Sequence, residues 1–217
     1  MPDIDTIRPG FDLTFQDDFD TLSKWRRDVR RFKTEPLPTN LVDDLLELAA
    51  LAPSVGNSQP WRFVKITSAH ARKSMRDHFQ VCNQDALEDY HGEKTKQYAQ
   101  LKLSGMDQAP TQIAVFCDQT TQLGHGLGKK TKPETLGYSV VMAVHTLWLA
   151  ARARGVGVGW VSILDPRQVE TILSAPQGWS FVAYLCIGWP EEEHQDPELV
   201  RHGWQKRVDI QKFIIER

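Results

Sequence analysis

The segment from Lys24 to Lys33 is the densest concentration of charge in the 217-residue chain, with six basic side chains around one acid, Asp28. Arg26 and Arg30 are four residues apart, so both can reach one phosphate, and the planar guanidinium group suits phosphate oxygens. A solvated charged face is the alternative, because most runs of charge have that role. Asp28 would repel a phosphate dianion. It therefore either pairs with an arginine, which composition alone favours, or takes part in chemistry nearby.

A second candidate is the polar loop PSVGNSQPW at residues 53–61, in which two prolines and a glycine restrict the backbone. Ser54, Asn57, Ser58 and Gln59 present hydroxyl and amide groups that donate and accept hydrogen bonds. Such a loop can hold a flat polar ligand. An ordinary turn between a helix and a strand has the same composition, so that alternative stays open.

The glycine run at residues 155–159 indicates a strand whose backbone another group can approach closely. It does not fit a dinucleotide-binding fingerprint, because these glycines end a helix and enter a strand. Ser162 beyond them lacks the GxSxG elbow of a hydrolase nucleophile. The late basic group ending at Arg207 either adds a second grip on a phosphate or belongs to a solvated tail.

Composition excludes several other classes of function. The net charge of −2 gives no support for binding to nucleic acid or to anionic membranes. The seven histidines show no HExxH-type spacing, so we expect no metal site. Cys82, Cys117 and Cys186 are expected to be reduced thiols. No apolar run is long enough to span a membrane and the N-terminus lacks signal-peptide features, so we expect a cytoplasmic protein.

The elements that position these residues follow from periodicity and turn chemistry. A single domain of residues 1–217 is expected, of the α+β class because helices and strands do not strictly alternate. A helix with Thr39 as its N-cap should end at Pro53, a second should cover residues 68–79, and a third should begin at Pro166 with Asp165 as its cap. A long apolar core or interface helix should cover residues 136–154. Strands are expected at residues 62–67, 112–118, 155–163 and 181–187.

Five further segments have a less regular pattern. Residues 1–16 are expected to form an extended arm, followed by a short helix at residues 19–25. Residues 82–108 are highly charged and favour helix, which is typical of either a lid or a solvated helix hairpin. An acidic run at residues 191–198 leads to a tail at residues 203–217. The apolar side chains of this tail need a partner surface.

Four motifs together resemble the flavin-destructase branch of the nitroreductase superfamily, the 5,6-dimethylbenzimidazole synthases. They are PSVGNSQPW at 53–61, RRDVR at 26–30, YSVVMAVHTLWLAARARGVGVGWVSI at 138–163 and AYLCIGWP at 183–190. The resemblance covers nearly all of residues 19–210. It implies a nitroreductase-like fold, with helices around a small mixed β-sheet, and an intertwined homodimer with two FMN sites at the subunit interface.

The resemblance also implies roles for individual residues. Arg26, Arg27 and Arg30 would hold the phosphate and ribityl end of FMN, and Arg207 would reach the phosphate from the tail. Residues 160–162 would line the flavin ring, which the loop at 53–61 would approach from the partner subunit. The implied FMN-binding residues are Arg26, Arg27, Asp28, Val29, Arg30, Pro53, Ser54, Asn57, Gly159, Trp160, Val161, Ser162 and Arg207. The segment 82–108 would be the lid.

The implied reaction consumes reduced FMN with O2 and yields dimethylbenzimidazole and erythrose 4-phosphate, with NAD(P)H acting through a separate flavin reductase. Asp28 and Ser162 would serve as the catalytic residues, in proton transfer and in positioning the flavin for oxygen. The alternatives are an NAD(P)H-dependent FMN nitroreductase and a flavin-sequestering protein. Two positions depart from the family pattern: Leu136 replaces an expected aspartate and Gln205 a frequent arginine.

Overall fold

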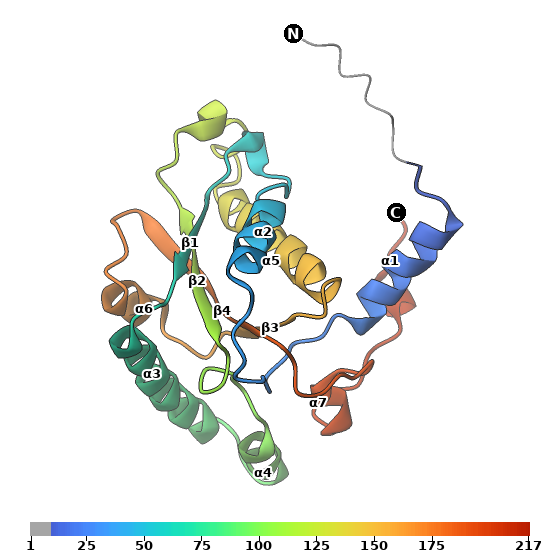
Figure 1. Ribbon diagram of the computed structural model, residues 1–217, viewed down its shortest axis with the longest axis vertical. Helices are drawn as coiled ribbons and strands as arrows, with labels where there is room; N and C mark the ends of the chain where they lie inside the picture. The colour runs from blue at the N-terminus through green and yellow to red at the C-terminus, as the bar shows by residue number, and fades with distance from the viewer. Residues whose placement is uncertain (1–9) are drawn as a thin grey trace.

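A four-stranded sheet with the strand order β1-β2-β4-β3 forms the centre of the computed structural model, which describes residues 10–217 (Figure 1). All neighbouring strands pair in the antiparallel direction. The described residues show parallel pairing only in an isolated bridge between Asp28 and Val158. The α+β class is confirmed, but the expectation of a mixed sheet is wrong for the described strands, because all four pair in the antiparallel direction.

Each strand expected from the sequence is present. Their bounds are β1 Trp61–Lys65, β2 Thr111–Asp118, β3 Gly157–Val161 and β4 Trp179–Gly188. The helices are α1 Leu13–Trp25, α2 Thr39–Ala49, α3 Ala69–Glu88, α4 Glu93–Gln100, α5 Thr135–Arg152, α6 Pro166–Ile172 and α7 Glu198–Arg201.

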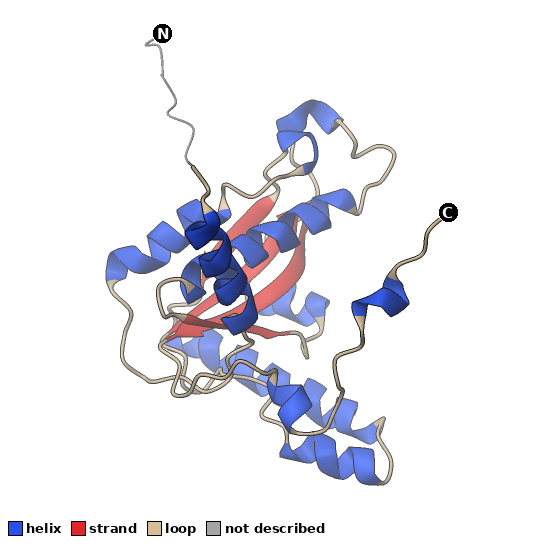
Figure 2. Ribbon diagram, turned by 90° about the vertical axis from the view of Figure 1, so that its right-hand side faces the viewer, coloured by secondary structure: helices blue, strands red, loops and turns tan. Residues whose placement is uncertain are grey.

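Helices cover both faces of the sheet, as Figure 2 shows. One core cluster joins the sheet to α2 and α5, and a second joins the opposite face to α3 and α6 (Figure 1). Residues 112–118 of β2 are all buried because this strand has a neighbour on each side and a helical layer on each face. Burial on both faces explains why β2 reads as a continuous apolar run rather than an alternating one.

The first helix begins earlier than the sequence predicted. The Asp12 carboxylate accepts a hydrogen bond of 2.9 Å from the Phe15 amide, so the helix starts at Leu13 and not near residue 19. The expectation of an extended arm is wrong for residues 13–16, and its first nine residues lie outside the described part. No residue of α1 is buried. Its apolar side chains Phe15, Phe19 and Leu22 nevertheless have the spacing of an amphipathic helix, and Phe15 and Phe19 stay exposed.

Two other helix boundaries differ from expectation. Pro38 and not Thr39 occupies the N-cap of α2, and no side chain caps that end. Helix α3 continues through the start of the charged segment 82–108 and ends at Glu88, because no helix breaker interrupts residues 80–88. The start of α6 was predicted correctly: the Asp165 carboxylate accepts a hydrogen bond of 3.0 Å from the Gln168 amide.

The end of segment 82–108 is anchored to the sheet by buried hydrogen bonds. The Gln112 amide donates to the Met106 carbonyl at 2.8 Å, and its oxygen accepts a 2.6 Å hydrogen bond from the Tyr184 hydroxyl. Arg72 of α3 donates to the Pro110 carbonyl at 2.7 Å. This side of the segment is therefore held in place, because breaking the bonds would leave buried polar groups without partners.

Candidate functional site

The motif RRDVR leaves the end of α1 and runs beside β3. The Val29 amide donates a hydrogen bond of 3.0 Å to the Val158 carbonyl. A Cβ atom on Gly159 would lie 2.1 Å from the Val29 carbonyl oxygen, and one on Gly157 would lie 2.9 Å from the Val29 side chain. The close approach predicted for the glycine strand is therefore confirmed. The group that approaches is the chain's own segment, which these glycines allow to lie against β3.

This contact places the Asp28 carboxylate at the end of β3. One oxygen accepts a hydrogen bond of 2.8 Å from the Trp160 amide, and the other accepts 2.8 Å from Arg30 Nε. The side chain is 29% exposed. Burial raises the pKa of Asp28, the Arg30 charge and the Trp160 amide oppose that rise, and the Glu198 charge adds to it. The ion pair that composition favoured is present.

Arg30 is committed to protein partners. Its guanidinium is 13% exposed, pairs with Asp28 and donates a hydrogen bond of 2.9 Å from Nη1 to the Lys102 carbonyl. Arg26 and Arg30 both line one cavity. Arg30 is nevertheless already neutralised there, so its predicted grip on a phosphate remains a prediction.

Three other arginines gather at the same cavity, which has a volume of about 140 Å³. Arg207 from the tail joins Arg26 and Arg27, as the sequence suggested. Burial lowers the pKa of Arg26 and of Arg27, and the positive charge of Arg207 lowers both further, while the Asp28 charge opposes the shift of Arg26 and the Asp196 charge that of Arg27. Within residues 10–217 no carboxylate forms an ion pair with any of the three. We refer to Arg26, Arg27 and Arg207 as the basic trio; it is a concentration of unbalanced positive charge.

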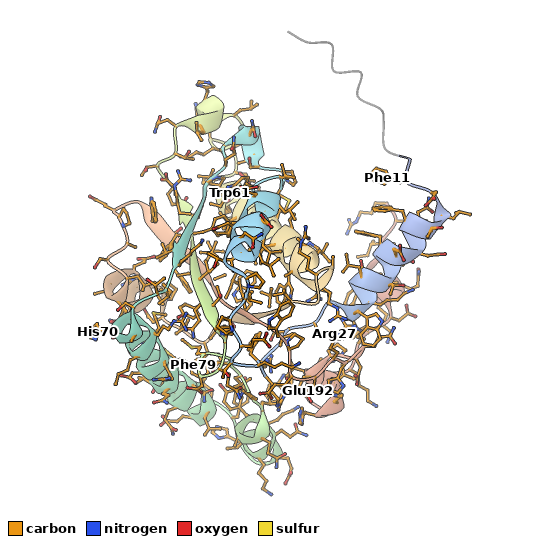
Figure 3. All side chains as sticks on the ribbon, in the orientation of Figure 1. Phe11, Arg27, Trp61, His70, Phe79 and Glu192 are labelled. Atoms are coloured by element: carbon orange, nitrogen blue, oxygen red, sulfur yellow. The ribbon has the colours of Figure 1, made fainter. Side chains whose placement is uncertain are left out.

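Backbone and aromatic contacts fix the first two members of the basic trio. Arg27 donates from Nε to the Gln195 carbonyl at 2.8 Å, and from Nη1 and Nη2 to the carbonyls of Arg26, Lys24 and Gln195, so its guanidinium is held by backbone oxygens at the end of α1 and before α7. Figure 3 shows Arg27 in this region, close to the labelled Glu192. The Arg26 guanidinium lies 5.0 Å from the ring centre of Trp148, a cation–π contact. Trp148 also donates a hydrogen bond of 3.1 Å to the Arg27 carbonyl, so α5 positions both arginines.

Ser162 follows the last residue of β3 and its side chain is exposed. It lies two residues after Trp160, whose amide holds Asp28. The structure therefore places Trp160 of the glycine strand beside Asp28, and Ser162 two residues further along the chain. No hydrogen bond joins Asp28 to Ser162 directly among the described contacts.

The loop at residues 53–61 has a fixed, unusual backbone. Gly56, Asn57 and Gln59 all have positive φ angles, of 57°, 56° and 44°. The Ser54 hydroxyl accepts from the Gln59 amide at 3.1 Å. Ser58, which sequence reasoning treated only as one polar residue of the loop, is buried and its hydroxyl has no hydrogen-bond partner. The loop is built to hold its polar groups in one arrangement.

Within one chain this loop lies far from Asp28. Figure 3 shows Trp61, the last loop residue, and Arg27, the neighbour of Asp28, at well-separated places. Pro53, Ser54 and Asn57 are therefore not brought together with the RRDVR motif by a single chain. Their predicted contact with the same ligand requires a second copy.

A metal-binding cluster and a membrane-spanning helix each have requirements that the described residues do not meet. No group of three or more histidine, cysteine or acidic side chains among residues 10–217 is arranged to hold a metal ion. None of the helices in the same range combines the length and the apolar character that crossing a bilayer requires.

Comparisons with known proteins identify the family. The family model described as Nitroreductase family matches residues 23–189. The chain is 58% identical to a 5,6-dimethylbenzimidazole synthase of Rhodospirillum rubrum over 92% of this chain and 94% of that protein. It is 46% identical to a 5,6-dimethylbenzimidazole synthase of Rhodobacter capsulatus over 92% of this chain and 96% of that protein.

A solved structure agrees with this assignment. The chain superposes with a TM-score of 0.68 and 25% identity on iodotyrosine deiodinase bound to FMN and 3-iodo-L-tyrosine, over 91% of this chain and 97% of that one. The similarity at the level of fold thus extends to a protein whose structure contains FMN. From the matched family model and the two highly similar relatives, the chain belongs to the nitroreductase family and, within it, to the 5,6-dimethylbenzimidazole synthases.

Proposed function

We propose that this protein fragments reduced FMN in an O2-dependent reaction to 5,6-dimethylbenzimidazole, the lower ligand of vitamin B12, and erythrose 4-phosphate. The names of its relatives support the product. The structural observation that supports it best is the Asp28 carboxylate, which the Trp160 amide holds at the end of β3 beside a cluster of unbalanced arginines.

The basic trio fits the phosphate of FMN. Three guanidinium groups without carboxylate partners at one cavity suit a dianion, which forms charge-assisted hydrogen bonds with arginine. Arg26, Arg27 and Arg207 would therefore hold the phosphate end. Arg30, already paired with Asp28, would contribute by orienting that carboxylate.

Asp28 and Ser162 would act at the reacting end. When bound, reduced FMN supplies the electrons for the reaction with O2. The raised pKa of Asp28 lets this carboxyl group keep a proton closer to neutral pH than an ordinary aspartate does, which suits a group that both gives and takes protons. The Ser162 hydroxyl is exposed at the same end of β3 and would hold the flavin in position.

A homodimer would complete the site. The outward side of α5 leaves Tyr138, Val141 and Met142 exposed, and the tail leaves Ile210 and Phe213 exposed, so both surfaces need a partner. In this arrangement Pro53, Ser54 and Asn57 would approach the flavin from the second subunit. Such a dimer accounts for the separation between loop 53–61 and Asp28 in one chain.

The remaining parts of the proposal concern access and electron supply. The segment 82–108 would act as a lid over the flavin and exclude water. A separate flavin reductase would use NAD(P)H to supply reduced FMN, and the reaction would take place in the cytoplasm.

A mass balance on FMN tests the proposed function. The protein is incubated in air with FMN, NADH and an independent flavin reductase, and total FMN and dimethylbenzimidazole are measured by mass spectrometry. We expect FMN to be lost and the benzimidazole to appear in equal amounts. Reoxidation with no loss of total FMN would indicate a flavin-sequestering protein. Rapid anaerobic reduction of bound FMN by NAD(P)H alone, with turnover of nitroaromatics, would indicate a conventional nitroreductase.

A further inference from the structure

Glu198, the first residue of α7, lies at the same cavity as Asp28 although 170 residues separate them in the chain. Its side chain is only 9% exposed. A carboxylate buried to this extent needs positively charged partners. Glu198 has two: Arg31, whose Nη1 lies 2.8 Å from Oε1, and Arg30, whose Nη1 lies 4.0 Å from Oε2.

Arg30 is therefore shared between two carboxylates. Its Nε donates to Asp28 at 2.8 Å, while its Nη1 faces Glu198 and donates to the Lys102 carbonyl. The guanidinium group can approach one carboxylate more closely only by moving away from the other, so the attraction of Glu198 for Nη1 opposes a closer contact of Arg30 with Asp28. The two carboxylates also repel each other across the cavity.

We propose that Glu198 is a positioning residue that competes with Asp28 for Arg30 and thereby favours the protonated form of Asp28. The proposal deepens the proposed function, since it rests on Asp28 being the group that transfers a proton. It assigns a task to α7, which otherwise only covers the cavity.

The charges around Asp28 act on its protonation with the signs that the proposal requires. Arg30, Arg26, Glu198 and the buried Cys186 interact electrostatically with Asp28. A second cavity that Asp28 lines adds the charged and titratable groups Arg27, Arg31, Arg152, Glu192, Glu193, His194, Asp196 and Arg201. The Glu198 charge raises the pKa of Asp28, and the Arg30 charge lowers it. Removal of the Glu198 charge therefore acts twice in the same sense: repulsion disappears, and Arg30 becomes more available to Asp28. Both effects lower the pKa of Asp28.

The groups that face Glu198 define the control. Besides Arg30 and Arg31, His202 Nε2 lies 3.7 Å from Glu198 Oε1. Glu192 contacts the same Arg31 at 3.2 Å and has no ion pair with Arg30. It also lines a cavity together with Asp28, but Glu192→Gln removes a carboxylate from Arg31 without removing one from Arg30.

The direct test is a pH titration of the Asp28 carboxyl carbon by NMR in protein labelled with ¹³C-aspartate, with the signal assigned through Asp28→Asn. In Glu198→Gln we expect the titration midpoint of Asp28 to move to lower pH, and in Glu192→Gln to stay at the wild-type value. An unchanged midpoint in Glu198→Gln, or an equal shift in Glu192→Gln, would overturn the proposal. Thermal unfolding verifies that each variant is folded.

A milder variant covers the case in which Glu198→Gln does not fold. Glu198→Asp keeps the charge and withdraws it from Arg30 by one methylene, so the midpoint should move in the same direction by a smaller amount. An unchanged midpoint in this folded variant would equally overturn the proposal.

The pH profile of FMN consumption distinguishes the effect of Glu198 on Asp28 from the role of Asp28 in the reaction. If Asp28 transfers the proton, the acid limb of the profile moves to lower pH in Glu198→Gln, in step with the NMR midpoint. Wild-type protein that consumes no FMN would refute the proposed function, and the NMR titration would still decide the role of Glu198. An NMR shift without a shift of the profile would remove Asp28 from the reaction while confirming its control by Glu198.

Discussion

The two clusters formed by the RRDVR motif differ in charge balance. Arg26 and Arg27 join Arg207 and have no carboxylate in an ion pair, whereas Arg30 is bound to Asp28 and faces Glu198. Both clusters line one cavity. Unbalanced positive charge suits the binding of an anion, and balanced charge around a buried carboxyl group suits the control of a proton.

The difference arises from partners and not from sequence spacing. The Trp148 ring of α5 lies against the Arg26 guanidinium, and its ring N–H donates to the Arg27 carbonyl. Arg30 instead donates to the Lys102 carbonyl and faces Glu198. Residues of one type in one short motif thus acquire separate roles from the elements that surround them. Four substitutions test this separation.

Asp28→Asn should have the largest effect. Asparagine still accepts from the Trp160 amide but cannot carry the proton, so product formation should fall about 10²–10⁴-fold while FMN binding stays within a few-fold. The rate of FMN loss measures the fall in turnover, and the equilibrium affinity measured by flavin fluorescence shows whether FMN binding is kept. Asp20→Asn, at an exposed acid of α1, is the control. An unimpaired product yield would remove Asp28 from the mechanism.

Gly159→Ala should disrupt the placement of the whole motif. The new methyl group would lie 2.1 Å from the Val29 carbonyl, so the segment must move, and we expect a loss of about 1–3 kcal/mol in the free energy of unfolding. Chemical denaturation measures it. Gly137→Ala in α5 is the matched control, because its Cβ has no heavy atom within 4 Å and alanine favours helix. Equal stability of the two variants would contradict the packing argument.

Arg207→Ala should weaken FMN binding roughly tenfold to a hundredfold, the range for a lost charge-assisted hydrogen bond of about 1.5–3 kcal/mol. Riboflavin, which has no phosphate, should bind the variant and the wild type alike. Titration of both ligands followed by fluorescence measures the difference, with Lys206→Ala as the control. An equal loss for riboflavin would show that the basic trio does not recognise the phosphate.

Trp148→Phe should have the smallest effect. Phenylalanine keeps an aromatic ring under Arg26 but removes the hydrogen bond to the Arg27 carbonyl, worth about 1 kcal/mol. FMN affinity should therefore fall roughly fivefold, and the rate of product formation at saturating FMN should not change. A selective loss of that rate would mean that Trp148 serves the Asp28 cluster as well as the basic trio.

Much of the fold could be predicted because its signals are local. The apolar run of β2 and the Asp165 cap are each contained in a few adjacent residues. The start of α1 was missed although Phe15, Phe19 and Leu22 have helical spacing, because the prolines, glycine and acids nearby gave the segment the composition of an irregular arm. The end of α3 was missed because residues 80–88 are mostly polar, although no helix breaker interrupts them.

Within the site, an ion pair could be predicted only where the RRDVR motif itself contains both of its residues. The Asp28–Arg30 ion pair joins residues two apart, and composition favoured it. Glu198 was missed because it lies in an acidic run that indicates only a solvated linker, and nothing in its spacing points to Arg30. The basic trio was expected from its resemblance to a family, and its convergence depends on tertiary contacts that no local pattern contains.

The hydrogen bond from Arg30 to the Lys102 carbonyl links segment 82–108 to the acid of the site. If the segment opens as the proposed lid and breaks this bond, Arg30 keeps only Asp28 and Glu198 as partners. The strength of the Asp28 pair and the population of the open segment would then obey one linkage relation. Under the proposed lid role, protonation of Asp28 would weaken its hold on Arg30 and shift the opening equilibrium, and access to the cavity would respond to pH.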